Sequence, residues 1–170
     1  GLAIGLYLYR TMTPRVAILG RHPDGSLRDA AVHQLPPSKV VTAVRFDGRL
    51  YFANVSYFED AILDAVAANP QARALLVVGN GINELDASGE EVMHHVVQHL
   101  RDAGIEVSFS GLKKQVVDVM RATGLLDFIG EQRLFATADE ALAAIHAEAA
   151  ARGQDDVTSP LRPVAARRFG

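Results

Sequence analysis

The chain has 170 residues, no cysteine and a formal net charge of −3 at pH 7. Hydrophobic residues make up 49% of it, which excludes a chain disordered throughout and suits one domain of ordinary size with a tail. The net charge is weakly acidic, whereas nucleic-acid binding usually needs a basic surface, so we expect no nucleic-acid partner. The absence of cysteine excludes disulfides and thiolate metal sites. Because residue 1 is glycine, we expect a fragment of a longer protein or a processed or cloned end.

The first nine residues form an apolar run that ends at Arg10. Residues 1–9 reach about half the length of a membrane-spanning helix, and they lack the basic start and the small-residue cleavage site of a signal peptide. Tyr7 and Tyr9 followed by Arg10 are typical of a helix end at the cytoplasmic membrane–water interface. Composition alone favours a buried first helix or strand of a soluble domain, so both interpretations stay open at this point.

An irregular connector and then a hairpin are expected next. Residues 21–39 hold three prolines and show little periodicity. Residues 40–46 alternate and are rich in β-branched side chains. Asp47-Gly48 after them is a strong hairpin signal, and residues 50–53 have the pattern of the returning strand. The sequence therefore predicts that two antiparallel strands joined as a β-hairpin open the sheet.

The remaining chain alternates helical and strand patterns, which predicts one α/β domain with a mixed sheet and helices packed on it. Capping-box spacings at Ser56, Ser88 and Thr137, each with Glu three residues later, mark helix starts, and Gly124 is expected to stop a helix. Residues 105–110 alternate strictly, so this strand should have one solvated face or lie near an edge. Helices are expected over residues 56–69, 88–103, 113–123 and 137–151, strands over residues 73–78, 105–110 and 134–135, and an apolar turn over residues 125–129.

The stretch from residue 75 to residue 91 organises the domain. Residues 75–78 are four large apolar side chains followed by glycine, as in a strand covered on both faces. Residues 79–85 have the pattern of a turn-rich loop, and Ser88 with Glu91 then opens a helix. Asp86 and Ser88 are therefore expected at a helix start just beyond a strand. Unpaired N–H groups and the helix dipole hold a phosphate or a carboxylate well at such a place.

Ser88 has two interpretations, which the sequence leaves open. Capping alone explains a serine at this position and contributes about 1 kcal/mol. Phosphorylation would instead place roughly two negative charges at the helix start, close to Asp86, Glu90 and Glu91. Those carboxylates would repel the phosphate, so the expected result is a changed surface for a partner.

No strong catalytic constellation is present. Gly79-Asn80-Gly81 follows a strand, but the chain lacks both the G-x-G-x-x-G fingerprint and the Walker lysine-serine pair, so a glycine turn is the better interpretation. His95, His99 and Glu91 share one helical stripe and could ligate a metal, although a solvated polar face explains them better. Neither Asp86 nor Ser88 has a nearby histidine for a nucleophile triad. We therefore expect no enzyme, no cofactor and no metal.

The order of several short motifs carries a family resemblance over residues 14–149. The motifs are Asp86-Ala87-Ser88-Gly89 after an apolar strand, a helix that ends near Leu100-Arg101, the strand at 105–110, and Lys113-Lys114. In this order they resemble a STAS domain. STAS domains occur as cytoplasmic tails of SulP-type sulfate and anion transporters and as stand-alone anti-sigma factor antagonists. In the antagonists the serine that matches Ser88 is phosphorylated by a partner kinase, and a hydroxyl residue is usual where this chain has Ala87.

The residues before the domain are similar to the connector of SulP transporters. The matching residues are Pro14-Arg15-Val16-Ala17-Ile18-Leu19-Gly20-Arg21, then Gly25, then Leu27-Arg28-Asp29. Stand-alone antagonists generally lack this connector. The resemblance therefore implies four parts: the cytoplasmic end of the last membrane helix or a linker over residues 1–13, a connector with a first short strand over 14–39, the STAS domain over 40–151, and a flexible tail over 152–170.

The resemblance implies a non-catalytic regulatory or assembly domain of a SulP-family transporter of sulfate or a related anion. It would lie on the cytoplasmic side of the inner (plasma) membrane as part of an integral membrane protein, with the membrane domain of the same transporter as partner. A regulatory protein, a nucleotide and a second copy of the chain are further candidate partners. Asp86, Ser88, Gly89 and Gly81 form the candidate site for phosphorylation or for contact with an anion or a nucleotide.

Two other functions stay open. One is a stand-alone anti-sigma factor antagonist that is switched by phosphorylation of Ser88. The other is a small α/β nucleotide-binding enzyme, which would show turnover that depends on Asp86.

Overall fold

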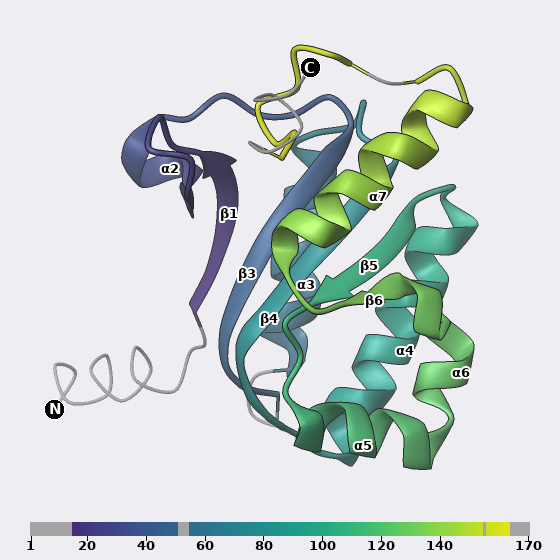
Figure 1. Cartoon of the computed structure of the whole chain (residues 1–170). Helices are drawn as coiled ribbons and strands as arrows, with labels where there is room; N and C mark the ends of the chain where they lie inside the picture. Colours follow the sequence, from purple (N-terminus) through teal and green to yellow (C-terminus); the bar gives the residue numbers. More distant parts are fainter. Residues whose placement is uncertain (1–14, 51–54, 155, 164–170) are drawn as a thin grey trace, which may run out of the picture.

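The computed structural model describes residues 15–50, 55–154 and 156–163. Their strands form one six-stranded sheet in the order β2-β1-β3-β4-β5-β6, with helices on both faces (Figure 1). This is the single α/β domain with a mixed sheet that the sequence predicts. The strands are β1 Arg15–Arg21, β2 Leu27–Asp29, β3 Val41–Leu50, β4 Ala74–Leu85, β5 Glu106–Ser110 and β6 Leu134–Phe135; the helices are α2 Ala30–His33, α3 Val55–Ala67, α4 Ala87–Asp102, α5 Lys114–Thr123, α6 Leu125–Ile129, the 3₁₀ helix η2 Glu131–Arg133 and α7 Ala138–Ala151.

The sheet is parallel on one side and antiparallel on the other. β3, β4, β5 and β6 run parallel, with Val77 of β4 opposite Val44 of β3 and Phe109 of β5. β1 pairs antiparallel with both β3 and β2. Parallel neighbours need a crossover connection, which α3, α4 and the pair α5 and α6 provide.

β4 is buried on both faces. Leu75 and Val77 belong to a core cluster that also contains side chains of α3, α4, α5 and α6. Leu76 and Val78 point the other way, into a second cluster with α7. Figure 1 shows the same layers, with α7 in front of the sheet and α3 behind it. The prediction of a strand covered on both faces is confirmed, and each such side chain contributes about 1.5–3 kcal/mol by burial.

The hairpin predicted at Asp47-Gly48 is wrong. β3 continues through both residues, which lie opposite Gly81 and Ile82 of β4. A turn here would break the ladder with β4, so long-range pairing overrides the local turn preference. The returning strand expected over residues 50–53 lies mostly outside the described residues. The sheet does open with a hairpin, but its strands are β1 and β2, and the turn between them holds Gly25 at φ 91°.

The second half of β4 and the whole of β5 also differ from expectation. Residues 79–85, predicted as a loop, continue β4 and pair with β3 through two register shifts. β5 lies next to the edge strand β6, as one expectation had it, but neither of its faces is solvated. Ser108 and Ser110 are 1% and 0% exposed, because α7 packs against β5 and serine is small enough to be buried.

Local capping signals are confirmed at some helix ends and fail at others. Thr137 accepts a hydrogen bond from the backbone N–H of Glu140 at 3.2 Å, and α7 ends where predicted. Gly124 ends α5 with φ 85°, as predicted. Ser56 lies inside α3 rather than before it. The apolar turn expected at 125–129 is the short helix α6, with three of its apolar side chains buried.

Residues 156–163 pack against the domain, whereas a flexible tail was predicted from residue 152. Arg21 of β1, itself only 7% exposed, holds this segment to the sheet. Its Nη2 donates to the carbonyl oxygen of Leu161 at 3.3 Å and to Asp139 Oδ1 of α7 at 2.9 Å. The sequence pattern of residues 152–170 does not predict this packing, because the residue that binds the segment, Arg21, lies in β1 near the other end of the sequence.

A second group of buried polar side chains joins the same segment to α7. His146 Nδ1 lies 2.7 Å from the Leu142 carbonyl oxygen, and Nε2 lies 2.9 Å from Ser159 Oγ, which is 2.8 Å from Ser38 Oγ. Because a carbonyl only accepts, Nδ1 carries a proton, and in the neutral imidazole the Ser159 hydroxyl donates to Nε2. The Ser38 hydroxyl then donates to Ser159, and its oxygen accepts from the backbone N–H of Val40 at 3.0 Å.

We predict that Arg21→Met lowers the free energy of unfolding by about 3 kcal/mol, because the carbonyls of Gly25 and Leu161 lose their donor. Asp139→Asn removes the same ion pair from a side chain that is 58% exposed, and should cost less than about 1 kcal/mol. Urea unfolding of both variants measures the difference. Equal losses would show that the carbonyl bonds contribute nothing beyond the ion pair.

Candidate functional site

The β4–α4 junction places Asp86 and Ser88 at a helix start beyond a strand. Asp86 is the N-cap, with extended backbone at φ −93° and ψ 179°, and its Oδ1 accepts from the N–H of Gly89 at 2.8 Å. Ser88 is the second residue of α4 and is half-buried. The capping box predicted for Ser88 and Glu91 is therefore wrong. Asp86 caps the helix because it lies three residues before Gly89, whose backbone N–H donates to its carboxylate.

Three of the four candidate residues lie together and the fourth lies apart. Asp86, Ser88 and Gly89 share the first turn of α4, where Gly89 is buried. Gly81 lies opposite Asp47 in the extended part of β4. Five strand residues at about 3.3 Å each place it roughly 16 Å from Asp86. A small ligand at the helix start therefore does not reach Gly81.

The turn after β5 packs against the end of β4. Gly111 has φ 66°, and a Cβ there would overlap the Asn80 side chain, so the position requires glycine. Lys113 donates to the Asn83 side chain, and Gln115 Nε2 donates to the Asn83 carbonyl at 3.3 Å. β5 ends at Ser110, opposite Val78, so β4 runs seven residues further along the carboxyl edge of the sheet, with the start of α5 against this extension and α4 after it. This is the edge at which open α/β sheets bind ligands.

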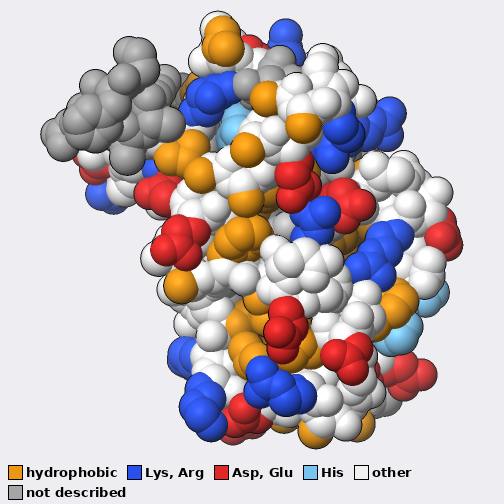
Figure 2. Space-filling model, turned by 45° about the vertical axis from the view of Figure 1, so that its right-hand side comes forward, with side chains coloured by type: hydrophobic (Ala, Val, Ile, Leu, Met, Phe, Trp, Pro, Cys, Tyr) orange, Lys and Arg blue, Asp and Glu red, His pale blue; other side chains and the backbone are white. Residues whose placement is uncertain are grey.

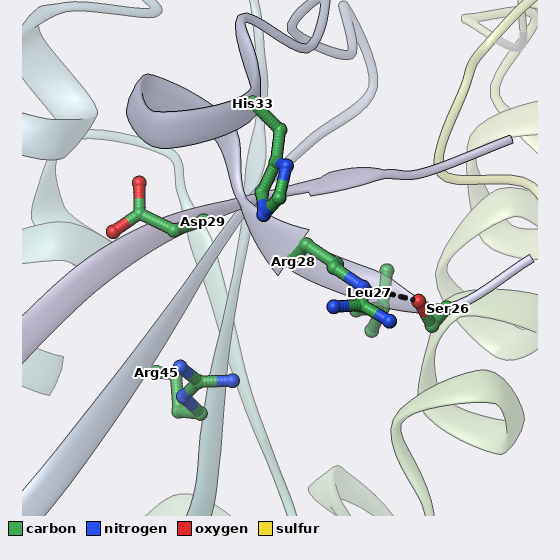
Figure 3. Close-up of a pocket in the computed structure, with 6 residues that line it drawn as sticks. All are labelled: Ser26, Leu27, Arg28, Asp29, His33 and Arg45. Atoms are coloured by element: carbon green, nitrogen blue, oxygen red, sulfur yellow. Dashed lines mark hydrogen bonds between the residues drawn. The ribbon is translucent and has the colours of Figure 1, made fainter. Parts of the chain in front are cut away.

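A separate cleft of about 410 Å³ lies between the connector and β3, lined by Ser26, Leu27, Arg28, Asp29, His33 and Arg45 (Figure 3). Arg28 donates from Nε to Ser26 Oγ at 2.9 Å and pairs with Asp24 at 3.1 Å. The hydroxyl and the backbone N–H of Ser26 hold the pKa of Asp24 well below its usual range. The Asp29 carboxylate accepts from two N–H groups of α2. These acidic and basic groups are therefore already engaged locally.

Sequence reasoning did not find this cleft. Its residues come from the β1–β2 turn, β2, α2 and β3, and antiparallel pairing through β1 brings them together. Arg45 lies opposite Ala17 on one side and Val78 on the other, so a cation stands among apolar neighbours. The one hint of the cleft in the sequence is Arg45, a charged residue within a strand pattern of mostly apolar side chains.

The polar face of α4 is partly structural. His95 and His99 are exposed with ring centroids 6.5 Å apart, and the described residues contain no group of three or more His, Cys, Asp or Glu suited to a metal. His94 stacks on Phe128 at 3.9 Å between centroids. Arg101 lies over the same ring and donates to the Phe128 carbonyl at 2.8 Å, which fixes α6 against α4. No pattern in the sequence predicts these contacts.

The visible surface carries both signs of charge. Figure 2 shows Lys, Arg, Asp and Glu side chains interspersed, with apolar side chains between them. No single sign dominates this face, which agrees with the net charge of −3.

The architecture is that of an α/β domain in which an antiparallel pair of strands, β1 and β2, precedes the parallel part of the sheet. Residues 34–141 match the family model described as "STAS domain", and the chain belongs to this family. The resemblance found in the sequence is thereby confirmed.

Two sequence relatives illustrate the similarity. The chain is 23% identical over 155 residues to "Probable sulfate transporter 4.2" of Arabidopsis thaliana, an alignment that covers 84% of this chain and 23% of that protein. It is 27% identical over 100 residues to "Putative sulfate transporter YvdB" of Bacillus subtilis (strain 168), covering 59% of this chain and 18% of that protein. The chain therefore spans less than a quarter of the length of these relatives.

Solved structures share the fold. SLC26A9 matches with a TM-score of 0.74 at 15% identity, covering 90% of this chain and 27% of that one. The SulP transporter STAS domain of Vibrio cholerae matches with a TM-score of 0.56 at 22% identity, covering 71% and 93%. The anti-sigma factor antagonist SpoIIAA in its unphosphorylated form matches with a TM-score of 0.53 at 16% identity, and the match covers 65% of this chain and 91% of that one. Among the described residues, none of the helices is long and apolar enough to span a membrane.

We predict that Asp86→Ala lowers the free energy of unfolding by about 1 kcal/mol, because α4 loses its cap, whereas Ser88→Ala costs less than about 0.5 kcal/mol. Chemical unfolding of the two single variants measures both. If Ser88→Ala lost more unfolding free energy than Asp86→Ala, Ser88 and not Asp86 would be the cap of α4.

Proposed function

We propose that the chain is the regulatory and assembly domain of a SulP-type transporter of sulfate or a related anion. In this proposal it stands on the cytoplasmic side of the plasma membrane, contacts the membrane domain of the same protein and catalyses no reaction. The supporting observation is the extent of the sequence similarity: the alignment with "Probable sulfate transporter 4.2" covers 84% of the chain. This alignment of 155 residues is longer than the stretch of residues 34–141 that matches the STAS family model, so it reaches beyond the part that all STAS domains share.

The connector has the mechanical properties that this role requires. β1 begins at residue 15 and pairs directly with β3, with Val16 opposite Phe46. Arg21 at its other end is fixed to α7 and to the C-terminal segment. A displacement of the chain before β1 would therefore reach the central strands instead of being absorbed by a loose linker. This supports regulation through the connector.

Within the proposed function, Asp86, Ser88 and Gly89 are the regulatory contact for a phosphate, a nucleotide or a partner protein. The half-buried Ser88 hydroxyl lies in the first turn of α4, where N–H groups and the dipole favour an anion. The same position supports the second candidate function, an antagonist switched by phosphorylation of Ser88. The two functions differ in what precedes the domain in the complete protein.

We predict that the reading frame upstream of Gly1 encodes several long apolar segments. The complete protein should then restore sulfate uptake to cells that lack their own transporter, because the membrane helices carry the anion. Measured uptake of labelled sulfate checks this, with an empty vector as control. A start methionine or a stop codon directly upstream would favour the antagonist instead.

We predict that a nucleotide titrated into the ¹⁵N-labelled chain shifts the amide signals of Asp86, Ser88 and Gly89 in a saturable way. The helix start offers the anion-binding groups, so Gly104 at the far end of α4 should not shift and is the internal control. If only distant amides move, the Asp86–Gly89 turn is a structural cap.

A further inference from the structure

We propose that a small cleft at the other end of the sheet binds a divalent oxyanion such as sulfate or phosphate. The cleft has a volume of about 170 Å³ and is lined by Lys39, Val40, Gln71, Arg73, Ala149, Arg152 and Gln154. It lies where β3 and β4 begin and where α7 ends. In Figure 1 this is the top of the molecule, whereas α5 lies at the bottom. The cleft is therefore distinct from the Asp86–Gly89 turn, beyond the far end of the twelve-residue strand β4.

The polar groups of the cleft are cations and amides. Lys39, Arg73 and Arg152 supply three positive charges, and Gln71 and Gln154 add neutral N–H donors. Val40 and Ala149 are the buried apolar floor. Among the described residues that line the cleft there is no carboxylate, so its chemistry favours an anion with several acceptor oxygens.

None of the three cations forms an ion pair with another described residue. Arg152 uses Nε for a hydrogen bond to Gln154 Oε1 at 3.2 Å. Lys39 lies near enough to Asp156 to help lower the pKa of that carboxyl, but hydrogen bonds from Thr158 are the larger cause. The positive charge of the cleft is thus only weakly compensated.

The acidic residues closest in sequence and register point elsewhere. Glu106 pairs in register with Ala74, next to Arg73, and Glu148 lies one turn before Arg152. Both carboxylates bind Arg133, at 3.3 Å and 2.9 Å. Arg133 is itself only 17% exposed and pairs with both of them, although the two carboxylates keep part of their surface in solvent. Two potential counterions are therefore already engaged.

The helix end beside the cleft does not repel an anion strongly. The last carbonyls of α7 would carry partial negative charge if they were unpaired. Here the N–H groups of Arg152, Gly153 and Gln154 donate to the carbonyls of Glu148, Ala149 and Ala150 at 2.8–3.2 Å. Gly153 permits this turn with φ 68°. These three carbonyls therefore have hydrogen-bond donors, and the side-chain cations determine the charge at the mouth of the cleft.

The volume of the cleft suits a small ion. Sites for larger organic ligands are typically about 300–1,000 Å³, so a cleft of about 170 Å³ suits a tetrahedral oxyanion rather than a nucleotide. Lys39 ends the connector, Arg73 precedes β4 and Arg152 ends α7. A bound oxyanion would therefore join three separate segments and stabilise the folded domain by mass action.

The test is a titration of the ¹⁵N-labelled chain with sodium sulfate against sodium chloride at matched ionic strength. We expect a saturable shift of the Val40, Gly153 and Gln154 amides with sulfate and not with chloride. Arg73→Gln and Arg152→Gln should each weaken the apparent affinity about tenfold. Lys114→Gln is the matched control, since it removes an equal charge from an exposed lysine that pairs only with Asp118.

Inorganic phosphate and acetate complete the experiment. Saturation by sulfate or phosphate, with little response to acetate or chloride, supports a divalent oxyanion site. An equal response to chloride, a response that never saturates, or an equal loss in Lys114→Gln and Arg73→Gln overturns it. If either arginine variant fails to fold, Lys39→Gln gives the same comparison. The test uses the chain alone, so its failure leaves the transporter proposal untouched.

Discussion

The burial of β4 on both faces fixes the rest of the molecule. Leu75 and Val77 pack beneath α3 to α6, and Leu76 and Val78 pack with α7. β3 and β5 pair with the two edges of the strand at the same time. A segment held from four directions cannot slip by one residue without moving every side chain to the wrong face. Its carboxyl end therefore delivers Asp86 to one place, and α4 begins there.

Buried polar contacts then attach the two ends of the domain to this core. Arg21 and the chain of hydroxyls from Ser38 through Ser159 to His146 join the connector, α7 and the C-terminal segment. Such groups stabilise a fold only when their partners are in place, because an unpaired buried donor or acceptor is costly. The connector and the last described residues are consequently packed as part of the domain. In the proposed regulatory role, this coupling would matter more than any single apolar contact.

The two ends of the parallel strands carry different chemistry. At the carboxyl end, the helix start with Asp86 and Ser88 follows the part of β4 in which Asn83 binds Lys113, at the edge where ligands usually bind in α/β sheets. At the other end, Lys39 and Arg73 lie close to the end of α7 with few countercharges. Under the two proposals made above, a partner would bind at one end and an ion at the other, and the same central strands connect the two sites.

The sequence by itself determined the elements whose signals are local: the buried strand at 75–78, the cap at Thr137, the stop at Gly124 and the α/β class. Only the tertiary structure decided that Asp47-Gly48 stays extended, that residues 79–85 continue β4, and that residues 156–163 are packed. In each of these cases the deciding partner is distant in the chain. A hydrogen bond or an apolar contact contributes the same free energy whatever the separation in sequence, but a local pattern records only the near neighbours.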